Sequence, residues 1–286
     1  FITYLLPSLR MQDPAQFVHN SSLKHKETIM LKQSVCAPIL KPAEIPYEQF
    51  IPQIAKIGYV GIEFWNPPQE LEKIHALVQE NDLTIPIING HASIEKGMND
   101  RTEHPRILKE LEKSLKLAQK YDIHGLICFA GTTDPNQSRD ISIQNCADCL
   151  AQIAPMAEDL GILLNLELLN SLVDHPGYEC NNTAFGVEVV ERVNSPFVKL
   201  LFDIYHMQIM EGNIITNMTR NTEWIGHVHT AGVPGRFDFD DEQEINYRGI
   251  MKALSAAKYA HYIGHEFHAK LPYLDSLQNA YNICNQ

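Results

Sequence analysis

The sequence predicts an α/β protein built as a single (β/α)8 barrel. Short apolar strands alternate with longer amphipathic helices eight times along the chain. The expected strand ends recur about every 33 residues, which is the length of one βα unit. The strands are apolar on both faces, as in parallel sheets covered by helices. Eight such units with right-handed crossovers close into a barrel.

Each element has a local signal in the sequence. The first clear strand is KQSVCA, and the helix after it ends at Gly58, a residue that suits the left-handed turn closing a helix. A Pro-Pro pair starts the second helix. The later strands are rich in β-branched and aromatic residues. The expected strands are 32–37, 59–64, 84–89, 124–130, 162–168, 197–203, 224–230 and 261–267. The expected helices are 47–58, 69–80, 102–121, 138–160, 182–194, 211–220, 246–258 and 272–284.

A doubly wound open sheet is the alternative architecture. Such sheets usually have fewer strands, and those that bind nucleotides carry a glycine-rich phosphate loop after the first strand. No such loop follows the strand at 32–37. The pattern therefore favours the barrel.

Composition limits the classes of partner. The chain has 286 residues, of which 44% are apolar, so it can bury a large core. The formal net charge of −12 argues against a nucleic-acid partner or an anionic membrane surface, because both need clustered basic charge. No apolar run reaches the roughly 18 residues of a membrane-spanning helix. An anionic small substrate stays allowed, since it needs only a local cation or a metal.

The beginning of the chain differs from the rest. Residues 1–29 lack clear periodicity, and we expect a flexible N-terminal extension there, followed by the barrel domain over 30–286.

The six cysteines are too dilute for a disulfide scaffold. Cys146 and Cys149 form a CxxC pair inside an expected helix without a second pair nearby, which favours ordinary helix cysteines over a redox or zinc site. Reduced thiols favour a cytoplasmic location, with a truncated export signal left open.

Polar residues close the last four expected strands. Glu167 ends the fifth strand and Asp203 the sixth, while His229 and Glu266 end the seventh and eighth. Barrel active sites lie at these strand ends. Three buried carboxylates repel one another unless a cation neutralises them, so the constellation predicts one divalent metal ion. Oxygen-rich ligation with one imidazole suits Mg, Mn or Co better than a structural zinc site. The alternative is four separately satisfied structural residues.

Four further residues are expected at the same mouth as substrate contacts. His206 follows Asp203 by three positions, in the loop expected after the sixth strand. Arg236 lies in the turn AGVPGR, where its guanidinium fork can hold a carboxylate. Glu63 and His91 close or follow the second and third strands and are placed on the opposite wall. A structural role is the alternative for each of the four.

Several segments resemble a known family. NLELLNS, KLLFDIYHMQIMEG and IGHVHTAGVPGR are similar to hydroxypyruvate isomerases of the xylose-isomerase-like TIM-barrel superfamily. The resemblance covers the chain beyond the N-terminal extension and is strongest over 161–267. It implies that the four strand-end residues bind the metal and that Glu167 and Glu266 move protons on opposite faces of the substrate. It also implies substrate contacts for His206 and Arg236.

The resemblance implies an intramolecular oxidoreductase that interconverts hydroxypyruvate and tartronate semialdehyde. A proton moves between adjacent carbons through an enediolate, with a carboxylate acting first as base and then as acid. The expected partner is a small hydroxy-keto acid or keto sugar, with a homo-oligomer left open. A ketose 3-epimerase or an inosose-type isomerase is the alternative on the same metal site. A metal-free binding barrel is the non-enzymatic alternative, and the net charge argues against the DNA-repair endonuclease branch of the superfamily.

Two departures from the family pattern bear on the substrate. His229 stands where many bacterial hydroxypyruvate isomerases carry Gln, which is closer to the epimerase pattern. Epimerases also carry a substrate-contacting acid a few residues beyond the glutamate of strand five. Leu172 and Val173 occupy that region here.

Overall fold

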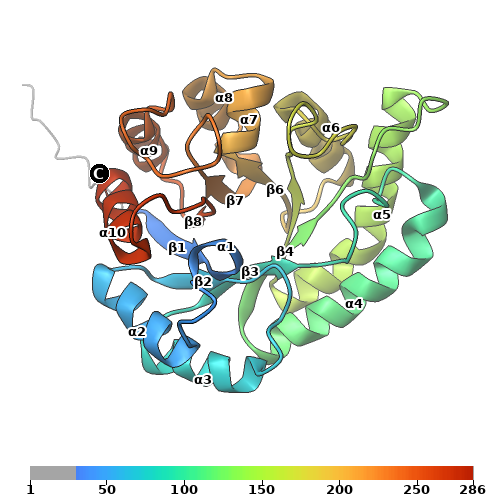
Figure 1. Ribbon diagram of the computed structural model, residues 1–286. Coiled ribbons are helices and arrows are strands. Elements are labelled where there is room, and N and C mark those ends of the chain that lie inside the picture. The colour runs from blue at the N-terminus through green and yellow to red at the C-terminus, as the bar shows by residue number, and fades with distance from the viewer. Residues whose placement is uncertain (1–29, 286) are drawn as a thin grey trace, which may run out of the picture.

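Eight parallel strands form one sheet in the computed structural model of the chain, which describes residues 30–285 (Figure 1). The strand order is β2-β1-β8-β7-β6-β5-β4-β3. The strands are β1 Lys32–Cys36, β2 Gly61–Glu63, β3 Ile85–Asn89, β4 Ile123–Cys128, β5 Leu163–Glu167, β6 Val198–Asp203, β7 Ile225–Thr230 and β8 Tyr262–His265. The predicted (β/α)8 barrel is confirmed, and the extension expected over 1–29 lies outside the described residues.

The barrel closes between β2 and β3, the two strands at the ends of this order. The N–H of Thr84 donates to the oxygen of Val60, and the N–H of Ile62 donates to the oxygen of Thr84, both at 3.0 Å. These bonds form a bridge between Gly61 and Thr84 in place of a full ladder. Because β2 has only three residues, the closure is short.

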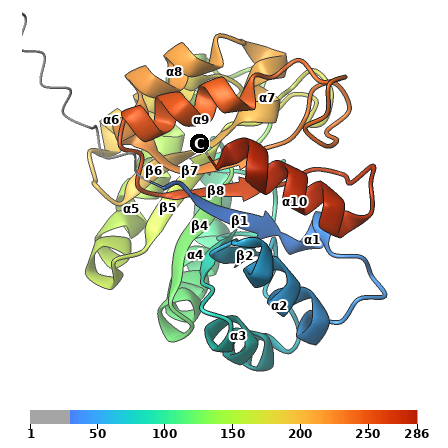
Figure 2. The ribbon, with the colours of Figure 1, turned by 90° about the vertical axis from the view of Figure 1, so that its left-hand side faces the viewer.

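Helices surround the strands. They are α1 Ala37–Leu40, α2 Tyr47–Ile57, α3 Leu71–Glu80, α4 His104–Lys120, α5 Arg139–Leu160, α6 Thr183–Val193, α7 Ile204–Met210, α8 Ile214–Arg220, α9 Tyr247–Ala256 and α10 Tyr273–Cys284. Figure 2 shows the last helix, α10, lying beside α2 and β1. The hydroxyl of Tyr59 donates to the oxygen of Leu277 at 2.8 Å, which joins the two ends of the domain. No helix within 30–285 is both long and apolar enough to cross a membrane.

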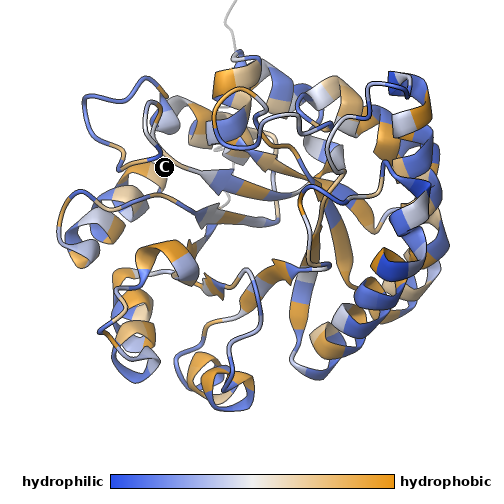
Figure 3. Cartoon of the chain, turned by 45° about the vertical axis from the view of Figure 1, so that its right-hand side comes forward, coloured by the Kyte–Doolittle hydropathy of each residue, from blue (hydrophilic) through white to orange (hydrophobic). Residues whose placement is uncertain are grey.

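Local chemistry explains the helix boundaries. Ser138 accepts a hydrogen bond from the N–H of Ile141 at the start of α5, and Gly161 ends that helix at a φ of 70°. Asn182 caps α6 in the same way as Ser138 caps α5. Apolar residues gather on the strands and on the helix faces that cover them, as Figure 3 shows. The barrel core is therefore continuous with the layer between strands and helices.

The segment after β6 differs from the expectation in two ways. His206 was expected in a loop, but it lies in helix α7, because the side chain of Asp203 accepts a hydrogen bond from the N–H of His206 and caps that helix. The helix expected over 211–220 begins only at Ile214. Gly212 and Asn213 have φ values of 59° and 50°, which break the helical path between α7 and α8.

Candidate active site

The carboxyl ends of β5 to β8 bring four side chains together. Glu167, Asp203, His229 and Glu266 each offer one ligand atom, and these atoms all lie within 4.8 Å of one another. All four side chains are buried. Glu266 follows β8 directly and stays in line with β7, because its N–H donates to the oxygen of Thr230 at 3.0 Å. The four residues that the sequence places in one layer thus meet in the structure, and we call them the mouth cluster.

His229 is central to the mouth cluster. Its Nδ1 lies 3.2 Å from an oxygen of Glu266 and 3.6 Å from an oxygen of Glu167. Its Nε2 faces the opposite way and bonds to Glu63 at 3.0 Å. Burial by itself lowers the pKa of His229, but the three carboxylates around the ring overcome this effect and raise its pKa well above the ordinary value.

The acidic groups of the mouth cluster differ in their electrostatics. Burial raises the pKa of Asp203 to about 7, although Arg236 and His229 act in the opposite direction. Burial also acts to raise the pKa of Glu266, but Arg236 and His229 hold it well below its usual range. Asp203 is therefore short of positive charge. No cationic side chain of the described residues makes a direct contact with its carboxylate.

Donors on both of its oxygens fix the carboxylate of Glu266. The indole N–H of Trp65 donates to one oxygen at 2.7 Å, and the guanidinium of Arg236 donates to the other at 2.6 Å. A second guanidinium nitrogen of Arg236 donates to the backbone oxygen of Glu266 at 3.3 Å. The guanidinium also lies over the ring of Tyr205, 5.4 Å from its centroid. Arg236 thus lies beside the mouth cluster and is bound in this structure to one of its glutamates.

His206 is oriented by a residue that the sequence reasoning missed. The side-chain oxygen of Asn170 accepts hydrogen bonds from the N–H groups of Val173 and Asp174, which fixes the orientation of its amide. The amide nitrogen of Asn170 therefore donates to Nδ1 of His206 at 2.7 Å. Nε2 of His206 then carries the hydrogen, and this buried atom has no hydrogen-bond partner among the described residues. It is a donor available to a ligand.

An acid also lies in the loop after β5. A carboxylate oxygen of Asp174 is 3.9 Å from Nδ1 of His206. The side chains of Leu172 and Val173 are largely exposed, and the acid lies at the next position in the chain. The signal was present in the sequence as the only acid in the NSLVDHPG loop, but only the fold of the loop turns it toward His206.

The two residues expected on the opposite wall are not members of the mouth cluster. Nε2 of His91 accepts a hydrogen bond from the N–H of Phe129 at 2.9 Å, and burial lowers the pKa of this imidazole to about 4. Nδ1 of His91 has no partner among the described residues. Glu63 is 1% exposed and lies behind His229, inside the barrel. The structure thus places Glu63 in contact with His229 of the mouth cluster and leaves His91 outside that cluster.

The donor set of the mouth cluster fits a divalent cation. Nδ1 of His229 is buried without a hydrogen-bond partner, although it faces two carboxylates. Three carboxylates and one imidazole offer hard oxygen ligands with a single nitrogen, which suits Mg, Mn or Co. Such an ion would also supply the positive charge that Asp203 lacks.

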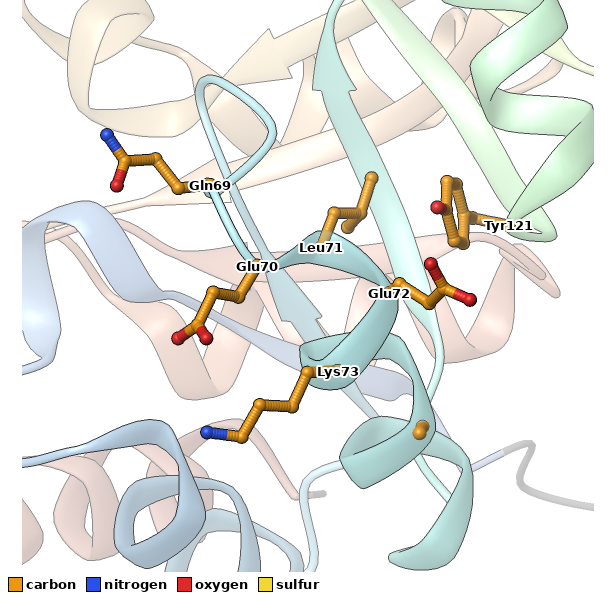
Figure 4. A pocket seen from close by; sticks show the side chains of 7 residues that line it. Gln69, Glu70, Leu71, Glu72, Lys73 and Tyr121 are labelled. Atoms are coloured by element: carbon orange, nitrogen blue, oxygen red, sulfur yellow. The ribbon is translucent and has the colours of Figure 1, made fainter.

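Other features of the described chain lie apart from the mouth cluster. A surface hollow of about 600 Å³ opens at the start of α3, and Figure 4 shows Glu70, Glu72 and Tyr121 around it. No residue of the mouth cluster lines this hollow.

Cys146 and Cys149 are buried free thiols in α5, and burial raises the pKa of Cys149 to about 12. A thiol with a raised pKa is a poor nucleophile, which favours the structural interpretation of the CxxC pair.

Comparison with known proteins places this arrangement in a family. The family model described as Xylose isomerase-like TIM barrel matches residues 51–282. The chain belongs to this family. A 2-oxo-tetronate isomerase of Cupriavidus necator is 33% identical to this xylose isomerase-like barrel over 73% of the chain and 82% of the relative. The hydroxypyruvate isomerase of Escherichia coli is 26% identical over 74% of the chain and 84% of the relative. The chain is an isomerase-type enzyme, as the sequence predicts.

Solved structures agree on the fold of this xylose isomerase-like barrel. A D-psicose 3-epimerase crystallised in the presence of D-fructose superposes with a TM-score of 0.73 at 20% identity, covering 90% of this chain and 100% of the other. The IOLI protein with a bound zinc atom gives a TM-score of 0.70 at 18% identity, covering 89% of this chain and 98% of the other. Because the sequence identities are this low, these two superpositions show only that the fold is shared.

Proposed function

We propose that the chain is a metal-dependent isomerase of small hydroxy-keto acids, with hydroxypyruvate and tartronate semialdehyde as the first pair to test. The observation that carries the proposal is the mouth cluster, whose four ligand atoms come from consecutive strands and lie within 4.8 Å of one another. Relatives named hydroxypyruvate isomerase and 2-oxo-tetronate isomerase support this substrate class.

The metal ligands in this proposal are Glu167, Asp203, His229 and Glu266. When bound, the divalent ion neutralises the carboxylates and stabilises the negative oxygen that develops on the substrate. We favour Mg or Mn, with Co as a further option, because most of the ligands are oxygens. The zinc atom of a structural neighbour supports divalent metal binding by a barrel of this shape.

Glu167 and Glu266 are the proposed acid–base groups. In hydroxypyruvate, the base removes a proton from the hydroxymethyl carbon, and the electron pair moves through an enediolate. The proton is then returned to the neighbouring carbon, while the hydroxyl proton passes to the other oxygen. Trp65 and Arg236 hold Glu266 from two sides, so its carboxylate is oriented before the substrate arrives.

The remaining polar groups are proposed to hold the substrate. Nε2 of His206 is a buried donor without a protein partner and suits a substrate oxygen. The guanidinium of Arg236 has five N–H groups, of which two bond to Glu266, so three further donors suit the substrate carboxylate. His91 has one free ring nitrogen, and we keep it as a candidate contact on the side of β3.

A ketose 3-epimerase is the second candidate, because a specific feature favours it. The mouth cluster contains His229 rather than Gln, and Asp174 supplies an acid in the loop beyond Glu167. A sugar substrate would bring hydroxyl groups in place of the carboxylate and would depend less on Arg236. The same metal and the same two glutamates serve both reactions.

The test is a substrate panel on protein stripped with chelator and reloaded with Mg, Mn or Co. Hydroxypyruvate, a 2-oxo-tetronate, D-psicose and an inosose are incubated in deuterated water, and the products are followed by NMR. We expect isomerisation of the keto acid with solvent deuterium entering at the carbon that receives the proton. Turnover of psicose alone would favour the epimerase. Equal activity with and without metal would contradict the metal-dependent mechanism.

A further inference from the structure

A fourth buried carboxylate lies beneath the mouth cluster, on the other side of His229. Glu63 closes β2, and its side chain is 1% exposed. One oxygen bonds to Nε2 of His229 at 3.0 Å. The other oxygen accepts a hydrogen bond from the hydroxyl of Ser34 and lies 3.0 Å from Nε2 of His227. No part of this carboxylate is left to meet a substrate.

Neighbouring strands make room for the carboxylate of Glu63 inside the barrel. Gly264 of β8 lies against it, and a Cβ atom at that position would overlap both carboxylate oxygens. β1 places Ser34 opposite Gly61 and Cys36 opposite Glu63 in the parallel register. The position is therefore built into the sheet, because a larger residue at 264 would displace the carboxylate.

In the hydrogen bond between Glu63 and His229, the donor and the acceptor can be assigned. A carboxylate only accepts hydrogen bonds, so the hydrogen of the Glu63–His229 contact is carried by Nε2 of the imidazole. Nδ1 is then the nitrogen that faces Glu167 and Glu266, and it has no hydrogen-bond partner among the described residues. By contrast, Nε2 of His227 is near Glu63 but makes no well-directed hydrogen bond. Glu63 is thus aligned with the histidine of the mouth cluster and not with its neighbour.

We propose that Glu63 is a positioning residue that holds His229 with Nδ1 directed at the metal. The proposal rests on the proposed function, since it takes the mouth cluster as a metal site. A carboxylate behind a metal-binding histidine fixes the ring and its tautomer and makes the ligating nitrogen more basic. Glu63 then acts on the reaction through His229, which replaces the direct substrate contact expected from the sequence.

A second metal site is the competing explanation for the same residues. Glu63, His227 and His229 also offer ligand atoms within 4.8 Å of one another. An ion there would need Nε2 of His229 while Nδ1 serves the mouth cluster, so one ring would bridge two cations. Both oxygens of Glu63 already accept hydrogen bonds, from Ser34 and from His229. The hydrogen-bonded arrangement accounts for these contacts without a second ion.

The experiment measures Mn binding to chelator-treated protein by calorimetry, for wild type, Glu63→Gln and His227→Gln. Glu63→Gln keeps the shape but removes the charge behind His229. His227→Gln is the matched control, because it changes the other neighbour of the same carboxylate and leaves the Glu63–His229 contact in place. We expect one Mn per chain in wild type, a dissociation constant about 10- to 100-fold higher in Glu63→Gln, and a change under about threefold in the control.

Ring ¹⁵N NMR of wild type supplies a readout that does not depend on a variant folding. The signals of His229, assigned with His229→Gln, should show a hydrogen on Nε2 in both the metal-free and the Mg-loaded protein. An Nε2 without hydrogen overturns the proposal. So does unchanged Mn affinity in Glu63→Gln, an equal loss in both variants, or binding of two Mn in wild type. Wild type that binds no divalent metal at all would instead overturn the proposed function, and the NMR result would then separate the two failures.

Discussion

The two halves of the barrel place different chemistry at the same edge. In the second half, β5 to β8 contribute the three carboxylates and the imidazole of the mouth cluster. In the first half, β1, β3 and β4 end in the uncharged residues Cys36, Asn89 and Cys128. The one charged end, Glu63 on β2, points into the barrel and contacts His229. Reactive groups thus gather on one half, and the other half supports them.

The difference between the two halves shows how the side chains of the mouth cluster are held in place. Trp65, just beyond β2, donates to Glu266, and Glu63 contacts His229, so residues of the first half support members of the mouth cluster in the second half. Each support acts on one member of the mouth cluster. A carboxylate fixed by neighbours loses less entropy when the substrate binds than one on a mobile loop.

The largest effect is expected from the glutamates of the second half. Glu167→Gln and Glu266→Gln keep the shape and remove the acid–base group, so the rate should fall by about 10²- to 10⁴-fold. The measurement is the isomerisation rate and deuterium incorporation with saturating Mn or Mg. Glu179→Gln is the control. Glu179 is buried, but it belongs neither to the mouth cluster nor to the group formed by Glu63 and its two histidines. Near-normal turnover in both glutamate variants would refute the mechanism.

Arg236→Lys is expected to show the next largest effect. Lysine keeps the positive charge but cannot reproduce the two guanidinium contacts to Glu266 or a bidentate grip on a carboxylate. We expect KM for an acidic substrate to rise about 10- to 100-fold, as charge-assisted hydrogen bonds are lost. Metal content, measured by mass spectrometry of the purified protein, should stay normal. Unchanged kinetics with the acidic substrate would exclude Arg236 from the site.

His91 should affect the stability of the fold in acid. Burial lowers its folded pKa to about 4 from an ordinary value of 6.5. Below pH 6.5 the unfolded chain takes up a proton that the folded chain does not, so stability falls as the pH drops from 6.5 toward 4. The loss is at most about 2 kcal/mol near pH 5. Urea unfolding near pH 7.5 and pH 5 should show a smaller pH-dependent loss for His91→Gln than for wild type, and equal losses would contradict the assignment.

The smallest effect is expected from a support in the first half. Trp65→Phe removes one hydrogen bond to the charged Glu266, so kcat should fall by roughly tenfold at most. Trp224→Phe is the matched control, because Trp224 packs with Lys199 at the N-terminal ends of β6 and β7, the ends opposite the mouth cluster. Steady-state kinetics of the two variants at saturating metal decide the point. Equal kcat in both would show that the first half does not orient Glu266.

Much of the fold could be predicted because its signals are local. The apolar strands, the Gly58 and Gly161 helix ends and the regular length of the βα unit all lie within short stretches of sequence. The start of α7 after β6 also has a local signal, because Asp203 caps this helix. A strand-end aspartate three residues before a histidine is an ordinary helix start, and it could have been found.

The sequence by itself determined the eight strands and the position of a polar residue at the end of each of the last four. It could not determine which way each side chain faces. Glu63 and Glu167 both end apolar strands, yet one contacts Nε2 of His229 from inside the barrel and the other faces Nδ1 from the mouth. That difference follows from strand register and from the space above Gly264, which involve residues some 200 positions apart along the chain. Only the tertiary structure brings such residues together, because contacts between distant strands leave no periodicity in the sequence.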